Sequence, residues 1–448
     1  PAANALPNGV TVVASGLTNP RGFTWGADGT LYLALAGTGG PNQVIAEDGT
    51  AYPYFGGMTS SIARIEDGCA VPVAEGLASF LWTDPGWIWG AMDVAILDGQ
   101  LYALLGGGGA DVGMPDNPNG VYRVSADGST EIIADLSAWF RENPPIDTPW
   151  DYGADGSLFD LEAGTGQLWV SEAVGGRLLA ITPDGQIALV ADLSVEHMVP
   201  TGVAVAPDGG AYVNHETVVP FPDGAAKVIH VAADGTVTDY WTGLTAGTDL
   251  AMGPDSALYA AEMATGNLEE PPYIQPGTGR VVRQTGPDSL EPVVTDIDYP
   301  VQVDFGPDGA LYLAYPAFAP DAGEEQGSLL RIDPGTGPVS LAGIGTLEPS
   351  CAGEMATGAG AAATPATAGD VSIVDFAYMP AELEIAVGTT VTWSNDDWPP
   401  HTVTANDGSF DSAGIDPAGT FSHTFDEPGE YAYSCTYHFL MAGSVTVS

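Results

Sequence analysis

A two-part pattern of apolar and polar residues recurs along the N-terminal part of the chain. Each copy is a short alternating run, a turn that often reads Asp-Gly, and a second run that begins at or near Leu-Tyr. Alternation with a period of two is typical of half-buried β-strands, and Asp-Gly favours a tight hairpin because both central turn residues need positive φ. The pattern therefore predicts a series of β-hairpins. The copies are GFTWGADGTLYLALAG (22–37), DVAILDGQLYALLGG (93–107), FDLEAGTGQLWVSEAVGG (159–176), GVAVAPDGGAYVNHE (202–216), DLAMGPDSALYAAEM (249–263) and VDFGPDGALYLAYPA (303–317).

Each of these hairpins is followed by a second one, such as GVYRVSADGSTEIIADL (120–136). Four strands per unit, repeated every ~40–50 residues, indicate the blades of a β-propeller. The chain lacks the long helical stretches that a (β/α)₈ barrel needs between its strands. A β-sandwich would not repeat one Leu-Tyr position six times. We therefore predict an all-β chain with a six-bladed propeller over residues 1–350.

The run GVTVVASGL (9–17) precedes the first blade and resembles the outer strand of a blade. We predict that it pairs with the last blade and closes the ring. Residues 351–370 are rich in Ala, Gly and Thr and have no apolar periodicity, which indicates a flexible linker. Alternating runs return over 371–448, bounded by Gly, Pro and Asp, and predict a second domain, a small Greek-key β-sandwich.

The second domain contains a set of metal-binding side chains. Cys435, His438 and Met441 are spaced along one short loop, and His401 lies upstream after the predicted strand VTW. Two imidazoles and a thiolate with a weak axial thioether form the donor set of a type 1 (blue) copper site. Structural zinc sites, in contrast, use Cys, His or carboxylate ligands. We expect one copper ion that alternates between Cu(I) and Cu(II). All four positions are protein ligands, so the expected role is electron transfer and not catalysis.

Residues 371–448 resemble the cupredoxins, and the short Cys-x-x-His-x-x-Met loop is most similar to that of amicyanin. The resemblance extends to Trp393 and to the run PGEYAYSC before the thiolate. It implies that Asn395 hydrogen-bonds near Thr436 and fixes the two ligand loops. It also implies an apolar docking patch around the loop histidine, although an ordinary apolar rim is the alternative. The candidate patch residues are Trp398, Pro399, Pro400, Phe439 and Leu440.

The N-terminal part resembles the propeller proteins of the scytonemin-cluster (ScyD/ScyE-like) family. The similarity depends on SGLTNPRGFTWGADGTLYLALAGTGG (15–40), DVAILDGQLYALLGGGG (93–109) and PTGVAVAPDGGAYVNHETVVPFPDGAAKVIHV (200–231). It implies a propeller fold and a location outside the cytoplasm, but no reaction.

The chain has three cysteines, and assigning Cys435 to copper leaves Cys69 and Cys351. Cys69 belongs to the first predicted blade and Cys351 follows the last, so a disulfide between them would fasten the ring closure. Two separate buried thiols are the alternative.

Three blades have an ionisable residue at one repeat position, where the others have Leu or Tyr. Glu172, His215 and Glu262 would lie near one end of the propeller channel. They could hold a cation such as Ca²⁺ or Zn²⁺ or act as acid and base, whereas a water-filled polar rim is the plainer interpretation. His423 shares strand parity with two phenylalanines and is expected to be structural.

Basic residues are scarce, with 9 Lys and Arg against 58 Asp and Glu, which gives a net charge of −49. Such a surface repels nucleic-acid phosphates and anionic lipid, so neither is expected as a partner. No apolar run reaches the ~18–20 residues that span a bilayer. The Pro-Ala-Ala start is consistent with a processed N-terminus, and we expect a secreted, cell-surface or periplasmic protein.

The sequence thus favours an electron carrier whose propeller binds a redox partner, a surface or copies of itself. Two alternatives remain open. In one, the propeller channel is an oxidoreductase or hydrolase that passes electrons to copper. In the other, the chain is a structural, self-assembling surface protein with a copper-binding module.

Overall fold

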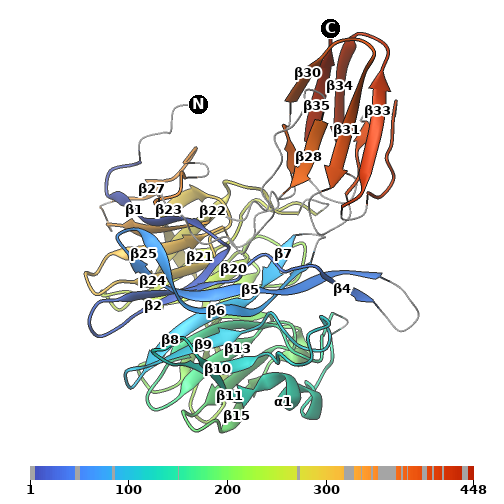
Figure 1. The fold of residues 1–448 in the computed structure, drawn as a ribbon. Coiled ribbons are helices and arrows are strands. Elements are labelled where there is room, and N and C mark those ends of the chain that lie inside the picture. Colours follow the sequence, from blue (N-terminus) through green and yellow to red (C-terminus); the bar gives the residue numbers. More distant parts are fainter. Residues whose placement is uncertain are drawn as a thin grey trace.

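The computed structural model describes residues 6–45, 51–82, 86–149, 151–269, 273–316, 327–333, 335, 337–344, 347–351, 370–374, 377–380, 382–395, 401–405, 408–415, 418–435 and 442–448. The predicted linker, 351–370, lies almost entirely outside them. The described residues form six small sheets in the N-terminal part and two in the C-terminal part, together with one short α-helix (Figure 1).

The six N-terminal sheets are the blades of a propeller, as the repeat predicts. In each, most strands that follow one another in the chain pair antiparallel, and the first strand of one blade contacts the first strand of the next. The strands are β2 (Pro20–Trp25), β3 (Leu31–Leu35), β4 (Asn42–Ile45), β5 (Ala51–Glu66), β6 (Cys69–Trp82) and β7 (Trp87–Trp89) in blade 1; β8 (Ala91–Leu97), β9 (Gln100–Leu105), β10 (Gly120–Val124) and β11 (Thr130–Asp135) in blade 2; β12 (Leu158–Ala163), β13 (Leu168–Glu172), β14 (Arg177–Ile181) and β15 (Ile187–Asp192) in blade 3; β16 (Pro200–Val205), β17 (Ala211–His215), β18 (Ala226–Val231) and β19 (Val237–Leu244) in blade 4; β20 (Gly247–Met252), β21 (Leu258–Glu262), β22 (Gly279–Gly286), β23 (Ser289–Ile297) and the parallel edge strand β27 (Val339–Ser340) in blade 5; and β24 (Gln302–Phe305), β25 (Leu311–Tyr315) and β26 (Gly327–Ile332) in blade 6.

The ring is closed by a strand from the start of the chain. β1 (Val10–Leu17) pairs antiparallel with β26 and becomes the outer strand of blade 6. Its inward-facing Ala14 and Leu17 pack in one apolar cluster with Phe23 and Leu33 of blade 1 and Leu329 of blade 6. Burial of this shared core therefore favours the closed ring over an open arc of blades.

Blade 1 departs from the regular pattern. Its strands β5 and β6 are much longer than the equivalent strands elsewhere and extend beyond the blade, where β4 and β7 pair with them. The sequence repeat did not predict this extension. It also did not predict α1 (Leu136–Glu142), which Asp135 caps by accepting a hydrogen bond from the Ala138 N–H at 2.8 Å, or the 3₁₀ turn Ser194–Glu196.

The C-terminal domain is a sandwich of two four-stranded sheets. One has the order β29–β28–β31–β33 and the other β30–β35–β34–β32, with parallel pairs between β28 and β31 and between β30 and β35. Trp393, Tyr378, Tyr433 and Phe425 fill the core between the sheets. The strands are β28 (Asp370–Val374), β29 (Ala377–Met379), β30 (Glu382–Ile385), β31 (Thr389–Asn395), β32 (Thr404–Ala405), β33 (Thr420–Phe425), β34 (Gly429–Ser434) and β35 (Ala442–Val447).

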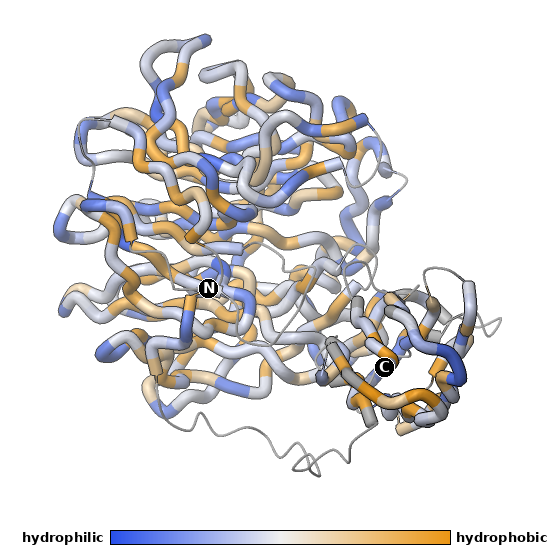
Figure 2. Tube along the Cα trace, turned by 90° about the horizontal axis from the view of Figure 1, so that it is seen from above, coloured by the Kyte–Doolittle hydropathy of each residue, from blue (hydrophilic) through white to orange (hydrophobic). Residues whose placement is uncertain are grey.

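Hydrophobic positions lie mainly along the strands, and hydrophilic positions are concentrated at the turns around the propeller rim (Figure 2). Each blade-to-blade interface has its own apolar cluster, so the propeller has a segmented core and no single centre. In the part of the chain that the structure describes, no helix is long and apolar enough to cross a membrane.

Candidate metal centre

Two of the predicted metal ligands lie side by side at one end of the sandwich. Cys435 follows the last residue of β34, and His401 precedes β32, where its backbone pairs with Ile415. Both side chains are buried, with exposed fractions of 6% for Cys435 and 0% for His401. The Cys435 Sγ atom lies 3.9 Å from His401 Nδ1. The thiol sulfur and the imidazole nitrogen thus face each other inside an apolar core.

The thiol sulfur also accepts a backbone hydrogen bond. The Thr402 N–H points at Cys435 Sγ with an N···S distance of 3.3 Å, and the Tyr378 hydroxyl donates to the Thr402 carbonyl at 2.5 Å. Burial and the nearby Cys435 raise the pKa of Tyr378, so its hydroxyl stays protonated and remains a donor. The peptide of Thr402 is therefore held from one side by Tyr378 and presents its N–H to the sulfur on the other.

Asn395 holds the backbone segment that pairs with His401. It is fully buried at the end of β31, and its Nδ2 donates to the Ile415 carbonyl at 2.8 Å. Ile415 in turn exchanges two backbone hydrogen bonds with His401, at 3.1 Å and 2.7 Å. Asn395 thus positions the backbone of His401 through Ile415. The hydrogen bond predicted near Thr436 involves a residue outside the described part of the chain.

Several other predicted site residues also lie outside the described residues. They are the ligands His438 and Met441 and the patch residues Trp398, Pro399, Pro400, Phe439 and Leu440.

The described donor pair fits a bound metal ion. Thiolate and imidazole ligands lie about 2.3 Å and 2.0–2.1 Å from a Zn²⁺ ion, and copper distances are of similar size, so at tetrahedral to trigonal angles the two donors are about 3.5–3.8 Å apart. The observed separation of 3.9 Å is close to this range. A thiolate, an imidazole and a rigid buried setting are the features that favour copper over a hard cation.

The sandwich and this donor pair together define a class of protein, the single-copper cupredoxins. Residues 366–448 match the family of copper binding proteins, plastocyanin/azurin family. Amicyanin-alpha from Methylorubrum extorquens is 33% identical over 105 residues, which are 22% of this chain and 88% of that protein. Through its C-terminal domain the chain belongs to the plastocyanin/azurin family, whose members carry one type 1 copper ion and transfer electrons to partner proteins.

Two solved structures resemble separate parts of the chain. A purple cupredoxin from Nitrosopumilus maritimus is 38% identical and covers 18% of this chain and 98% of that one, with a TM-score of 0.17. Virginiamycin B lyase from Staphylococcus aureus is 16% identical and covers 68% of this chain and 80% of that one, with a TM-score of 0.40.

The predicted channel site at Glu172, His215 and Glu262 is not formed. Glu172 is paired with buried Arg177 at 3.0 Å, and Glu262 is paired with Arg280 of its own blade. His215 Nδ1 accepts from the Val199 N–H at 3.0 Å, and burial, followed by nearby Lys227, lowers its pKa to about 4. Within the described ranges, no three His, Cys, Asp or Glu side chains gather to hold a metal ion. Each of the three side chains is instead engaged by a neighbour of its own blade, namely Arg177, Val199 or Arg280.

The acids between the inner strands are different residues, Asp93, Asp160 and Asp249, here called the interblade aspartates. Each is at most 3% exposed, and each accepts a backbone N–H from the inner strand of another blade. Asp93 accepts from Leu161 at 2.9 Å. The other two accept from Val203 at 2.6 Å and from Val303 at 2.8 Å. These bonds join blades 2 to 3, 3 to 4, and 5 to 6.

Burial raises the pKa of every interblade aspartate, and the nearby Asp160 carboxyl raises those of Asp93 and Asp249 further. The repeat contained a signal for them, since DVAIL, FDLEA and TDLAM each place Asp at the start of the inner strand. At the matching position blade 1 has Gly22, and a Cβ there would lie 1.5 Å from the Asp93 carboxylate. The acids therefore act in blade-to-blade packing.

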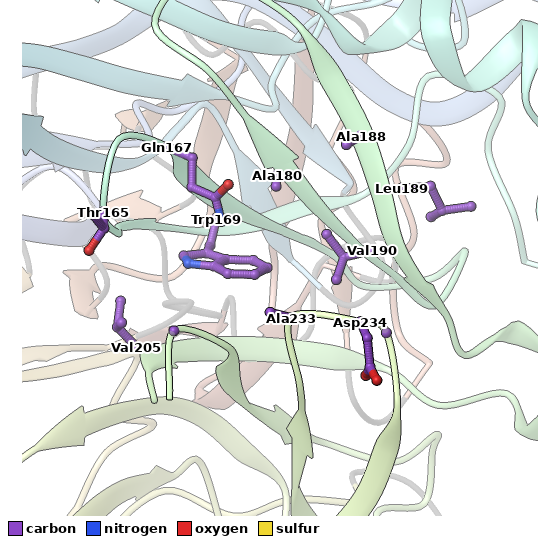
Figure 3. Close-up of a pocket in the computed structure, with 12 residues that line it drawn as sticks. Thr165, Gln167, Trp169, Ala180, Ala188, Leu189, Val190, Val205, Ala233 and Asp234 are labelled. Atoms are coloured by element: carbon purple, nitrogen blue, oxygen red, sulfur yellow. The ribbon is translucent and has the colours of Figure 1, made fainter. Parts of the chain in front are cut away.

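An open groove of about 500 Å³ lies between blades 3 and 4, with Trp169 on its floor (Figure 3). Its one ionisable lining residue is Asp234, whose pKa is lowered by hydrogen bonds from Thr236. A single exposed carboxylate supplies neither an acid–base pair nor a ligand set, so we assign the groove no chemistry.

Cys69 and Cys351 are joined in a disulfide with a Cα–Cα distance of 5.5 Å. The residues before Cys351 run beside β1, where the Ser15 N–H donates to Ser350 Oγ at 2.7 Å and the Ser15 hydroxyl donates to the Glu348 carbonyl at 2.7 Å. The end of the propeller segment is therefore fastened both to blade 1 and to the closing strand.

Proposed function

We propose that this chain is an extracytoplasmic single-electron carrier in which His401, Cys435, His438 and Met441 bind one copper ion. The observation that supports it most directly is the buried approach of Cys435 Sγ to His401 Nδ1 at 3.9 Å. When bound, copper supplies a Cu(I)/Cu(II) couple that accepts and releases one electron.

The chain's own residues hold the described ligands in place without a bound metal. The Thr402 N–H donates to the sulfur and so stabilises negative charge on it. Asn395 and Ile415 fix the backbone of His401, and the core around Trp393 prevents the ligand strands from moving apart. A site that changes little between its two charge states lowers the structural cost of gaining or losing an electron.

The proposal assigns the propeller a binding or localising role and no reaction. The interblade aspartates form hydrogen bonds between blades. Glu172 and Glu262 are paired with arginines of their own blades. The resemblance to the scytonemin-cluster propellers and the Cys69–Cys351 disulfide, a bond that persists in oxidising compartments, support a location outside the cytoplasm.

The test is the visible absorption of the full chain after loading with Cu(II). Wild type should show the intense thiolate-to-copper band, and Cys435→Ser should lose it completely. His423→Gln is the matched control, because His423 packs against Phe410 at 4.6 Å on β33 and is not a proposed ligand. An uncoloured wild-type protein, or a coloured Cys435→Ser variant, would refute the proposal.

A further inference from the structure

The extension of blade 1 carries a continuous set of aromatic rings. These rings, here called the aromatic ribbon, come from β5, β6 and β7. Tyr54 is central, with its ring centroid 5.9 Å from that of Tyr52, 6.1 Å from Phe80 and 5.7 Å from Trp82. Trp87 continues the set at 5.6 Å from Trp82, and Trp89 lies 5.1 Å from Phe80 in a stacked pair. The ribbon is therefore one connected surface of tyrosine, phenylalanine and tryptophan.

This surface is exposed and nearly uncharged. Tyr52 is 44% exposed, Met58 further along β5 is 47% exposed, and the other rings are half-buried. Residues 51–63 and 76–92 contain one charged side chain, Asp84, whereas 15% of the whole chain is charged. Exposed aromatic patches of this kind mark interaction surfaces. On a protein with a net charge of −49, it is also a place where a second acidic body meets little repulsion.

The disulfide fixes where the segment leading to the copper domain begins. Cys351 is bonded to Cys69, the first residue of β6, and the ribbon residues Phe80 and Trp82 lie at the other end of the same strand. That strand spans roughly 45 Å at ~3.3 Å per residue. The segment 352–369 can extend to roughly 60 Å, so the copper domain is able to reach the ribbon of its own chain.

The orientation of the sandwich agrees with such a contact. β34 runs antiparallel to β35, so Cys435 lies at the end opposite the C-terminus. Figure 1 shows the C-terminus at the end of the sandwich remote from the propeller, so the opposite end, where β34 finishes, is the one on the propeller side.

We infer that the aromatic ribbon is the docking surface for the copper end of this chain's own cupredoxin domain, namely the ligand loops 396–400 and 436–441. These loops contain Trp398, Pro399, Pro400, Phe439 and Leu440, an apolar complement to the ribbon. Docking covers the edge through which electrons reach the copper, and release exposes it to a partner. The inference rests on the proposed copper function and adds a controlled access to it.

The test adds a charge to the ribbon without emptying a core. Tyr52→Glu places a carboxylate on the uncharged surface, and Tyr240→Glu is the matched control, since Tyr240 is 38% exposed and lies on β19 of blade 4. The copper-loaded full chains are compared by small-angle X-ray scattering and by the rate at which ascorbate bleaches the blue band. Tyr52→Glu should increase the maximum dimension and speed the bleaching severalfold, and Tyr240→Glu should match wild type.

The outcomes separate the two proposals. An unchanged blue band in all three proteins shows an intact copper site, whereas absence of the band in wild type contradicts the proposed function itself. With the band intact, docking is refuted if wild-type scattering already fits two independently moving bodies, or if both variants behave alike. Wild type could also scatter with twice the mass of one chain, and Tyr52→Glu alone could restore the mass of one chain. That result would overturn the inference, because the ribbon would then bind a second copy.

Discussion

At the scale of single residues, the site is organised around one peptide group. The Thr402 peptide donates its N–H to Cys435 Sγ, and its carbonyl accepts from Tyr378. The Tyr378 hydroxyl is therefore linked to the sulfur through the Thr402 peptide. Groups that orient metal ligands in this indirect way commonly tune metal sites.

Tyr378→Phe should lower both stability and the strength of the Thr402 contact to sulfur. The change leaves a buried carbonyl with one fewer donor, which costs about 1 kcal/mol. Thermal unfolding of the copper-loaded chain measures the stability. The reduction potential of the copper site, followed through its blue absorption band, measures the change in the Thr402 contact to sulfur. The matched control is Tyr433→Phe, whose ring lies 4.7 Å away and whose hydroxyl donates to no backbone carbonyl among the described residues. Equal effects of the two variants would contradict this role for Tyr378.

The sequence could predict this site only in part. Cys435 and His401 were recognisable because their spacing and residue types match a known donor set. The role of Tyr378 was not, since it follows from a hydrogen bond to a backbone carbonyl in a distant loop, the one before β32. Every residue type has a backbone carbonyl, so a hydrogen bond to one leaves no pattern in the sequence.

At the scale of elements, the interblade aspartates hold neighbouring inner strands together. The blades themselves were predictable, because hydrophobic alternation and Asp-Gly turns are local signals. The hydrogen bonds that join inner strands of neighbouring blades were not predictable. The partner of Asp249, for example, is the backbone N–H of Val303 in the next blade, and a backbone group gives no signal in the sequence. The extension of blade 1 was missed for a similar reason, since the repeat describes an average blade.

Asp249→Ala should destabilise the contact between blades 5 and 6. It removes the acceptor for the buried Val303 N–H, which costs about 1–3 kcal/mol. The measurement is thermal unfolding of wild type and both variants at one fixed pH, so that the raised pKa of Asp249 does not enter the comparison. Asp304→Ala is the control, because among the described residues Asp304 accepts from its adjacent Phe305 N–H at 2.7 Å and from no other blade. A smaller loss in Asp249→Ala than in this control would show that the bond contributes little.

At the scale of the whole molecule, charge and ring closure determine stability. Burial raises the pKa of Asp304 to about 7 and that of Glu216 to about 8. Each folded-state pKa is above the ordinary value, so the folded chain binds these protons more tightly than the unfolded chain does. The stabilisation is complete below the ordinary values of 3.8 and 4.5 and is lost as pH rises through about 7 and about 8.

Stability should therefore decline as pH rises from about 4 to about 8, with the interblade aspartates adding to the slope. Melting temperatures across this range measure the effect. Asp304→Asn, which is neutral at every pH, should show a smaller decline than wild type between about pH 4 and about pH 7. A melting temperature that rises steadily to pH 9 would contradict the raised pKa values.

The disulfide should contribute strongly because it bridges a sequence separation of 282 residues. The chain-entropy model gives about 5 kcal/mol for so long a loop. The double variant Cys69→Ser with Cys351→Ser should lose about 3–5 kcal/mol, since the Ser15 hydrogen bonds still hold the segment in place. Chemical denaturation measures the loss. A reductant should reduce the stability of wild type and leave the variant unchanged, and equal stabilities without reductant would exclude the effect.

The closing strand also dictates when the ring can be completed during synthesis. β1 is made before the rest of the propeller, yet its partner β26 and the half-cystine at position 351 are among the last propeller residues to be made. At ~5–20 residues per second, Cys69 waits about 15 s to 1 min for Cys351. Until then β1 has no partner strand and Cys69 has no partner thiol. A factor that covers β1 during this interval should therefore affect the yield of closed rings.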